Sequence, residues 1–181
     1  MGKIVSVIPK DLAALKIIHF PDPRLSKPAS DVTEFDDALA RLVERMFELM
    51  YAARGVGLAA PQVGLPLRLF VSSPTVTDDD RHVYLNPRVL SQDGQQEEEE
   101  GCLSLPGITT TLKRFNRVTI EAQDLAGRKF QESGEELIAR IFQHEMDHLD
   151  GRLIVDRMGT VARLAYRRAL KELQEDFEAE K

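Results

Sequence analysis

A His-Glu-x-x-His sequence at residues 144–148 is the strongest chemical signal in the chain. Two histidines four residues apart on a helix project from one face, where their imidazoles can bind a divalent metal ion. Glu145 lies about 100° around such a helix from His144, so it can reach a metal-bound water and act as its general base. The pattern predicts metal-assisted hydrolysis, although an ordinary surface helix can carry the same two histidines.

A hydrolytic metal site needs a third protein ligand and an open position for water. No histidine or cysteine follows His148, and Asp150 is too close in sequence to serve. The single cysteine, Cys102, lies upstream in a segment flanked by glycines, which indicate a loop of unusual shape. A lone cysteine is about as often a small buried hydrophobe. Here we expect Cys102, His144 and His148 to be the ligands, with Cys102 a ligand rather than a nucleophile.

A third segment, residues 55–64, reads Gly-Val-Gly-Leu-Ala-Ala-Pro-Gln-Val-Gly. It has neither the lysine of a phosphate-binding loop nor the glycine spacing of a dinucleotide site. Taken alone, it is typical of a helix-to-strand connection with small packing residues. Gln62 is the one polar side chain between Val56 and Val63. Its amide is expected either to satisfy a hydrogen bond in the core or to point a donor into a site.

Together and in this order, the three segments resemble the peptide deformylase family. That family has a Gly-x-Gly-x-Ala-Ala-x-Gln segment, a Glu-Gly-Cys-x-Ser segment and a His-Glu segment ending in Asp-His. Residues 55–62, 100–104 and 144–148 match them without departure at a defining position. With Pro21-Asp22-Pro23-Arg24-Leu25 and Asn86-Pro87, the resemblance runs from about residue 15 to residue 158.

The resemblance implies the same three metal ligands, with Glu145 as the general acid/base. It also implies that Gln62 and the backbone N–H of Leu103 hold the oxygen of a formyl group. The reaction is removal of the N-formyl group from the first methionine of newly made polypeptides, with attack by a metal-bound water and release of formate. One divalent ion is implied per chain, natively Fe(II), with zinc or nickel able to occupy the same site.

Substrate contacts are expected from two other parts of these motifs. Gly55, Val56 and Gly57 should allow close backbone approach, so that the cavity accepts formyl but is cramped for acetyl. Leu137 lies about two turns and Ile141 about one turn before His144 on the same helical stripe. We expect them to line the methionine pocket, with plain core packing an equally good interpretation.

Two other functions compete with deformylation. A zinc endopeptidase would use both histidines and take Asp156 or a distant glutamate as the third ligand. A non-catalytic, metal-stabilised interaction domain would bind a metal with no open position. The presence of Glu145 and Gln62 favours an enzyme, because a structural metal site needs neither.

Three helices are expected to position these residues. The first runs from about Asp36 to Ala53, with six apolar residues at helical spacing, and should end at Gly55. The second follows Gly134, carries the histidines and ends before Gly151. The last is an amphipathic helix over about 160–178. Its expected packing residues are Leu164, Leu170, Leu173 and Phe177.

The middle of the chain has the pattern of short strands. Residues 67–72 and 83–85 are β-prone, and the second of these should end at Asn86-Pro87. Residues 118–123 alternate apolar and polar side chains, and after a turn at 124–127 residues 128–131 should pair back. The predicted class is α+β: one domain over 1–181, with antiparallel strands around a central metal-binding helix and helices near both ends.

Composition narrows the remaining choices. The 181 residues fit a single domain, and the net charge of −6 argues against a DNA-binding or general nucleic-acid-binding protein. One cysteine permits no internal disulfide and suits a reducing compartment. No apolar run is long enough to span a membrane, and neither secretion nor organelle import is expected from the sequence. Residues 1–6 formally fit an N-myristoylation pattern, but no basic patch follows, so a cytoplasmic protein is expected.

Other charged residues have expected roles as well. In the charge run Glu97–Glu100, the first three residues should be solvated. Glu100 is the exception, and it is expected to orient the metal loop that carries Cys102. Lys113 or Arg114 should meet the peptide substrate, and His19 and His82 have no evident partner. Nascent N-formylmethionyl polypeptides are the expected partners. A weak ribosome contact is a further hypothesis, and it rests on basic residues of the last helix: Arg163, Arg167, Arg168 and Lys171.

Overall fold

The computed structural model describes residues 7–180, so the lipidation pattern in residues 1–6 lies outside the described part. The helices are α1 (Asp37–Ala52), α2 (Glu136–Leu149), α3 (Ile154–Arg157), α4 (Thr160–Ala165) and α5 (Arg167–Ala179), with 3-10 turns η1 (Pro23–Ser26), η2 (Ala60–Val63) and η3 (Asp78–Asp80). The strands are β1 (Gly57–Ala59), β2 (Leu69–Ser72), β3 (His82–Asp93), β4 (Gln96–Gly101), β5 (Thr109–Arg114), β6 (Arg117–Gln123) and β7 (Lys129–Glu135).

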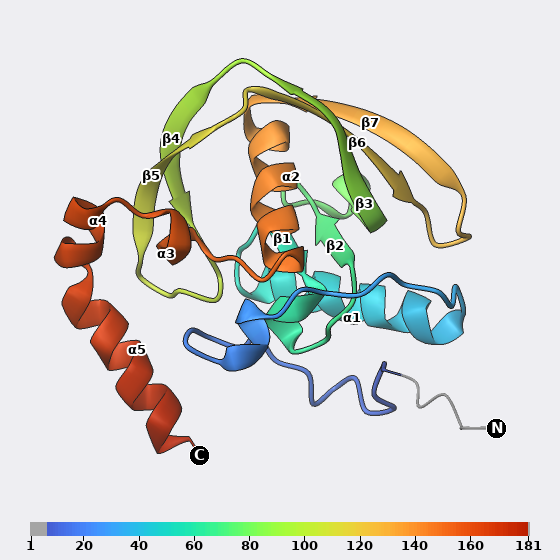
Figure 1. Ribbon diagram of the computed structural model, residues 1–181. Helices are drawn as coiled ribbons and strands as arrows, with labels where there is room; N and C mark the ends of the chain where they lie inside the picture. Colours follow the sequence, from blue (N-terminus) through green and yellow to red (C-terminus); the bar gives the residue numbers. More distant parts are fainter. Residues whose placement is uncertain (1–6, 181) are drawn as a thin grey trace.

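The strands form two antiparallel sheets around helix α2. In the larger sheet the order is β1-β2-β3-β6-β7, and β4 pairs with β5 in a separate hairpin. Figure 1 shows α2 passing between the larger sheet and the β4–β5 hairpin, with α1 below and α4–α5 along one side. The predicted α+β class, with antiparallel strands around a central helix, is confirmed.

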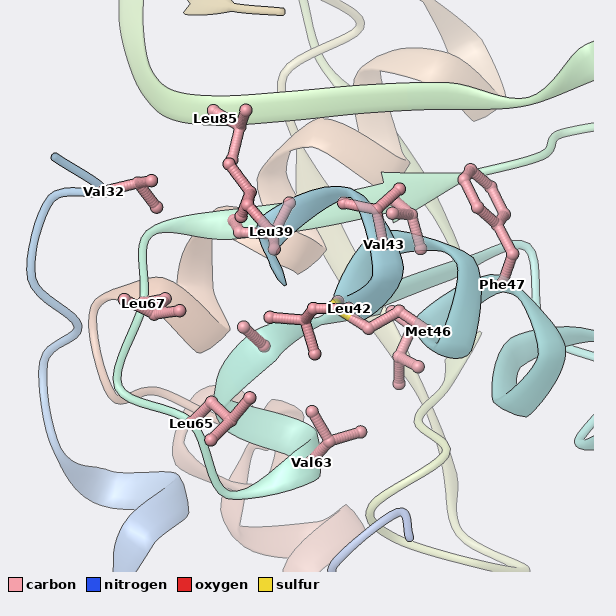
Figure 2. Close-up of a cluster of buried hydrophobic side chains, with 14 of the residues drawn as sticks. Val32, Leu39, Leu42, Val43, Met46, Phe47, Val63, Leu65, Leu67 and Leu85 are labelled. Carbon is pink, nitrogen blue, oxygen red and sulfur yellow. The ribbon is translucent and has the colours of Figure 1, made fainter. Parts of the chain in front are cut away.

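Helix α1 forms because one stripe of apolar side chains can be buried. The Asp36 side chain caps the helix by accepting a hydrogen bond from the Leu39 N–H at 2.9 Å. All six predicted apolar residues are buried where α1 packs on β1 and β2. Figure 2 labels Leu39, Leu42, Val43, Met46 and Phe47. The predicted extent of the helix is confirmed to within one residue at each end, but the left-handed residue that follows it is Arg54 (φ 58°) rather than Gly55, whose N–H bonds to Met50 O.

Helix α2 has the predicted extent and packs one side on the larger sheet. Ala139, Phe142 and Leu149 are buried in a cluster with Phe70 and Tyr84 of the sheet. The helix ends before Gly151, as expected, and this glycine has a φ of +74°. The face that carries the two histidines is turned toward the β4–β5 hairpin, where His144 contacts Glu100.

The strands confirm some expectations and correct others. Val118, Ile120 and Ala122 are buried on alternate positions of β6, and β7 pairs back on it as predicted. The predicted end of a strand at Asn86-Pro87 is wrong. Strand β3 continues to Asp93 through a register shift, and Asn86 (φ 52°) bonds there to the backbone of Val32. Strand β4 was not predicted, because its run of glutamates lacks an apolar alternation.

The C-terminal helix is broken at Tyr166 into α4 and α5. Leu170 and Leu173 pack as predicted against a third buried cluster, which includes Leu25, Leu105 and Ile154. Leu164 is 67% exposed, so its predicted packing is wrong. At the other end, Leu12, Leu15 and Ile17 pack on the α1 core, which gives the segment before Pro21 a structural role. None of the helices in residues 7–180 is long and apolar enough to cross a bilayer.

Candidate metal centre and active site

Helix α2 and the segment between β4 and β5 bring three ligand atoms together. The Nε2 atoms of His144 and His148 lie 3.2 Å apart. The Sγ of Cys102 lies 3.4 Å from Nε2 of His148. Within residues 7–180, this is the set of cysteine, histidine and acidic side chains grouped closely enough to hold a metal ion. The three predicted ligands therefore meet at one point.

The spacing of these atoms fits a tetrahedral metal site. Metal–nitrogen bonds of about 2.0–2.1 Å and metal–sulfur bonds of about 2.3 Å put neighbouring ligand atoms roughly 3.3–3.6 Å apart. The separations of 3.2 and 3.4 Å are close to these values. Donor atoms with lone pairs repel at such distances unless a proton or a cation lies between them. Because Cys102 and His144 also line a cavity, a bound ion would keep an open side.

Glu100 holds the ring of His144 from behind. Its Oε2 lies 3.0 Å from Nδ1 of His144, so the other ring nitrogen faces the metal site. Arg114 donates to both carboxylate oxygens of Glu100, at 2.8 and 2.9 Å. Burial raises the pKa of Glu100, but hydrogen bonds from Arg114 and His144 outweigh this and lower the pKa to about 2. Glu100, expected to orient the metal loop, is thus an ionised acceptor that orients a ligand.

The expectation that Arg114 meets the substrate is wrong. Its side chain is 3% exposed, and its Nη1 donates to Asp147 at 2.7 Å. Arg157 of α3 donates two further hydrogen bonds to Asp147. Sequence reasoning missed Asp147 and Arg157. The only available signal was a second carboxylate inside the His-Glu-x-x-His pattern.

Glu145 is buried beside the three grouped ligand atoms. It is 4% exposed, and its Oε2 has no hydrogen-bond partner among the described residues. Burial raises the pKa of this carboxyl to about 7, against the opposing charge of His144. Gly57 packs directly against it, since a Cβ at this glycine would lie 2.9 Å from the Glu145 carboxyl carbon. A buried carboxyl group with one oxygen free is suited to accept and return a proton.

Gln62 points a donor toward Cys102, and a donor pointing into a site is one of the two roles that its sequence context allowed. Its Oε1 accepts from the Ala59 N–H at 2.9 Å, which fixes the amide so that Nε2 is the donor end. Nε2 lies 3.2 Å from Ser104 Oγ and 3.8 Å from Cys102 Sγ. No described residue accepts a hydrogen bond from the N–H of Leu103, which lines the same cavity. Ser104 was not singled out from the sequence.

A cavity of about 660 Å³ opens beside these groups. Its walls include all five expected substrate contacts: Gly55, Val56, Gly57, Leu137 and Ile141. Leu137 is 48% exposed at the mouth, whereas Ile141 is 4% exposed in the wall. Gly55 is also tightly packed, since a Cβ there would lie 2.6 Å from Leu103 Cδ1. The cavity therefore joins the glycine segment, the cysteine segment and helix α2.

Three other polar residues have defined positions. His19 lines the cavity. His82, expected to lack a partner, lies outside the cavity with its Nε2 2.8 Å from Asp80 Oδ1. Asp156 accepts a hydrogen bond from the Leu153 N–H at 2.8 Å, which caps α3. Asp156 is therefore not grouped with the two histidines as a third ligand.

Similarity to known proteins extends over most of the chain. Residues 14–163 match the family model of polypeptide deformylase. A peptide deformylase of Acidobacterium capsulatum is 46% identical over 160 residues, covering 87% of this chain and 94% of that protein. A peptide deformylase structure from Legionella pneumophila is similar with a TM-score of 0.85 at 44% identity, covering 92% of this chain and 98% of that one. One from Plasmodium falciparum gives a TM-score of 0.88 at 38% identity, covering 91% and 98%.

Proposed function

Because the chain belongs to the peptide deformylase family, we propose specific roles for its residues in the reaction of that family. The protein is a hydrolase that removes the N-formyl group from the N-terminal formylmethionine of new polypeptides and releases formate. One observation supports the assignment of residues most strongly. The three grouped ligand atoms lie beside a cavity that Glu145 and Gln62 also line.

Cys102, His144 and His148 would hold one divalent ion per chain. The ion supplies Lewis acidity, which makes water nucleophilic at neutral pH and polarises the formyl oxygen. We propose Fe(II) as the native metal, with zinc or nickel able to replace it. A thiolate and two imidazoles suit each of these metals, and the family resemblance favours iron. Metal analysis of protein purified without oxygen tests this assignment.

Glu145 moves the proton. Its Oε2 lacks a protein partner among the described residues, so it can accept the proton of the attacking water. As the bond between the formyl carbon and the methionine nitrogen breaks, the same carboxyl group returns the proton to the leaving amine. Hydrolysis then yields formate and a free N-terminus. The contact with Gly57 restricts where this carboxylate can lie.

Gln62 and Leu103 stabilise the charge that develops on the formyl oxygen. The Gln62 amide is held by Ala59, and the Leu103 N–H is free of protein acceptors in the described chain. Donors fixed before the reaction need no reorganisation when negative charge forms, and one such donor is worth roughly 3–4 kcal/mol in the transition state. Both groups border the cavity next to Cys102.

Formate release from N-formyl-methionyl peptide, compared with its N-acetyl twin, is the primary test. We expect iron-loaded protein to release formate rapidly and to leave the acetyl peptide intact, because Gly55 and Gly57 give a cramped carbonyl site. Leu137 and Ile141 would bind the methionine side chain. Absence of formate from protein shown to contain iron would reject the function. Internal cleavage of an unformylated peptide would favour the zinc endopeptidase instead.

The wider setting belongs to the same proposal. We infer that nascent chains are met in the cytoplasm, where the single thiol stays reduced, and that residues 1–181 form one deformylase domain. A weak ribosome contact would use the basic side of α4–α5. Unchanged co-sedimentation with ribosomes after charge reversal of Arg163, Arg167, Arg168 and Lys171 would reject that contact.

A further inference from the structure

A line of ion pairs joins the metal centre to α3 on another side of α2. Glu100 contacts His144, and Arg114 donates to Glu100 on one side and to Asp147 on the other. Arg157 then holds Asp147 through Nε to Oδ2 and Nη2 to Oδ1, both at 2.6 Å. The connection therefore runs from a predicted metal ligand to a residue outside the active-site cavity.

Arg114 serves two buried carboxylates at once. Glu100 is 5% exposed and Asp147 is 8% exposed, so neither can rely on water for charge compensation. A buried charge that loses a partner is strongly destabilised. Without Arg157, Asp147 would depend on Arg114 alone among these charged groups. Arg114 would then shift toward Asp147 and weaken the two hydrogen bonds that it donates to the Glu100 carboxylate.

Arg157 is well placed to prevent this shift. Its helix α3 is fixed by burial of Ile154 and Val155, which are 2% and 3% exposed, and by the Asp156 cap. The guanidinium of Arg157 meets Asp147 at a cleft beside α2, away from the cavity that faces His144. A role through the ion pairs is therefore separable from direct contact with metal or substrate.

We propose that Arg157 is a positioning residue of the metal centre. By neutralising Asp147 it preserves the two hydrogen bonds from Arg114 to Glu100. Glu100 in turn holds His144 in the orientation that binds metal. This role rests on the proposed function, because it assumes that the three ligands bind a metal ion. Metal affinity, rather than deformylation, is the property that Arg157 controls most directly.

Co²⁺ titration of the metal-free full chain tests the proposal, with thiolate-to-cobalt absorption as the signal. Arg157→Gln keeps a shorter, polar side chain and removes the charge. Arg157→Lys keeps the charge. Arg152→Gln is the matched control, because Arg152 lines the same cleft and its side chain has no hydrogen bond among the described residues. The double variant with Asp147→Asn removes the charge that Arg157 balances.

We expect Arg157→Gln to weaken Co²⁺ binding roughly three- to tenfold, less than the 10- to 100-fold typical of a group touching a ligand. The Co²⁺ affinities of Arg157→Lys and of the Asp147→Asn/Arg157→Gln double variant should lie within about twofold of the wild-type affinity. The affinity of Arg152→Gln should equal that of the wild type. Equal affinities in Arg157→Gln and Arg152→Gln would overturn the proposal. So would failure of both the lysine and the double variant to restore binding.

Three further outcomes are also decisive. If Arg157→Gln does not fold, the lysine and double variants carry the test, and weak binding in both rejects charge balance as the role. A wild-type chain that binds no Co²⁺ would overturn the proposed function together with this inference. A wild type that binds metal and releases formate, with unchanged affinity in Arg157→Gln, would remove only the inference.

Discussion

The α-carbon of Gly57 faces the carboxylate of Glu145 so closely that a methyl group there would lie 2.9 Å from the carboxyl carbon and 3.1 Å from Cγ. Gly57 belongs to strand β1 and Glu145 to helix α2, which pack on each other. Glycine is therefore required at position 57 because the Glu145 side chain leaves no room for a Cβ. The backbone conformation does not require it, since the φ of Gly57 is not in the left-handed region. It determines where the proposed proton carrier can lie.

Gly57→Ala should reduce kcat/KM on the order of 100-fold, because even a 1 Å displacement of a reacting group can have that effect. Steady-state deformylation of a formyl-methionyl peptide measures the change. Gly159→Ala is the control, since a Cβ at Gly159 would meet nothing within 4 Å. Similar activity in the two variants would show that Glu145 tolerates displacement.

Gln62→Glu should lower kcat on the order of 10²–10³-fold with a smaller effect on KM. The substitution keeps an oxygen for the Ala59 N–H but replaces the donor end with another acceptor, where negative charge develops in the transition state. Kinetics at saturating substrate measure the change, and thermal unfolding checks the fold. A kcat within about threefold of wild type would exclude Gln62 as an oxyanion donor.

Cys102→Ser should weaken metal binding by more than about 100-fold, because a neutral hydroxyl replaces an anionic thiolate ligand. Metal content after dialysis against a chelator measures the loss, and formate release should fall in parallel. Ser104→Ala, in the same segment and 0% exposed, is the control that should retain the ion. Internal cleavage of an unformylated peptide that survives in Cys102→Ser would instead support the endopeptidase interpretation.

Ile141→Ala should reduce the preference for formyl-methionyl over formyl-alanyl peptide roughly tenfold, since a lost apolar contact in a pocket is worth about 1–3 kcal/mol. The ratio of the two kcat/KM values measures this preference. Ile154→Ala is the matched control, because Ile154 is 2% exposed and does not line the cavity. Both changes should lower stability by about 2–5 kcal/mol. An unaltered ratio in Ile141→Ala would assign that residue to core packing.

Tyr84→Phe should make unfolding less sensitive to alkaline pH. Burial raises the pKa of Tyr84 above its usual value of 10.0, and the carboxylate of Glu132 adds to the shift. The folded state therefore favours the neutral phenol. The stability that this provides is complete below pH 10 and falls above it by up to about 1.4 kcal/mol per pH unit.

Urea unfolding from pH 9 to pH 11 measures this slope. Tyr51→Phe is the control, because Tyr51 is only partly buried and its hydroxyl bonds to the carbonyl oxygen of Thr77. Equal pH slopes for wild type and Tyr84→Phe would contradict the prediction.

The sequence alone determined the parts of this protein that depend on short-range pattern. The apolar stripe of α1, the alternation in β6 and the histidine spacing of α2 were each predicted and found, because helix and strand periods are local properties. The grouping of Cys102 with His144 and His148 was predicted from ligand chemistry and from the resemblance of three short motifs, and it was found as well.

Tertiary structure alone decided how the site is supported. The position of Glu100 beside the cysteine segment separated it from the other glutamates, but the sequence did not show its partner, because Arg114 reaches Glu100 only when β4 pairs with β5. Arg114 was misassigned and Arg157 was missed for the same reason. A charged side chain shows in sequence only what it could bind, whereas its actual partner is set by which distant elements pack together.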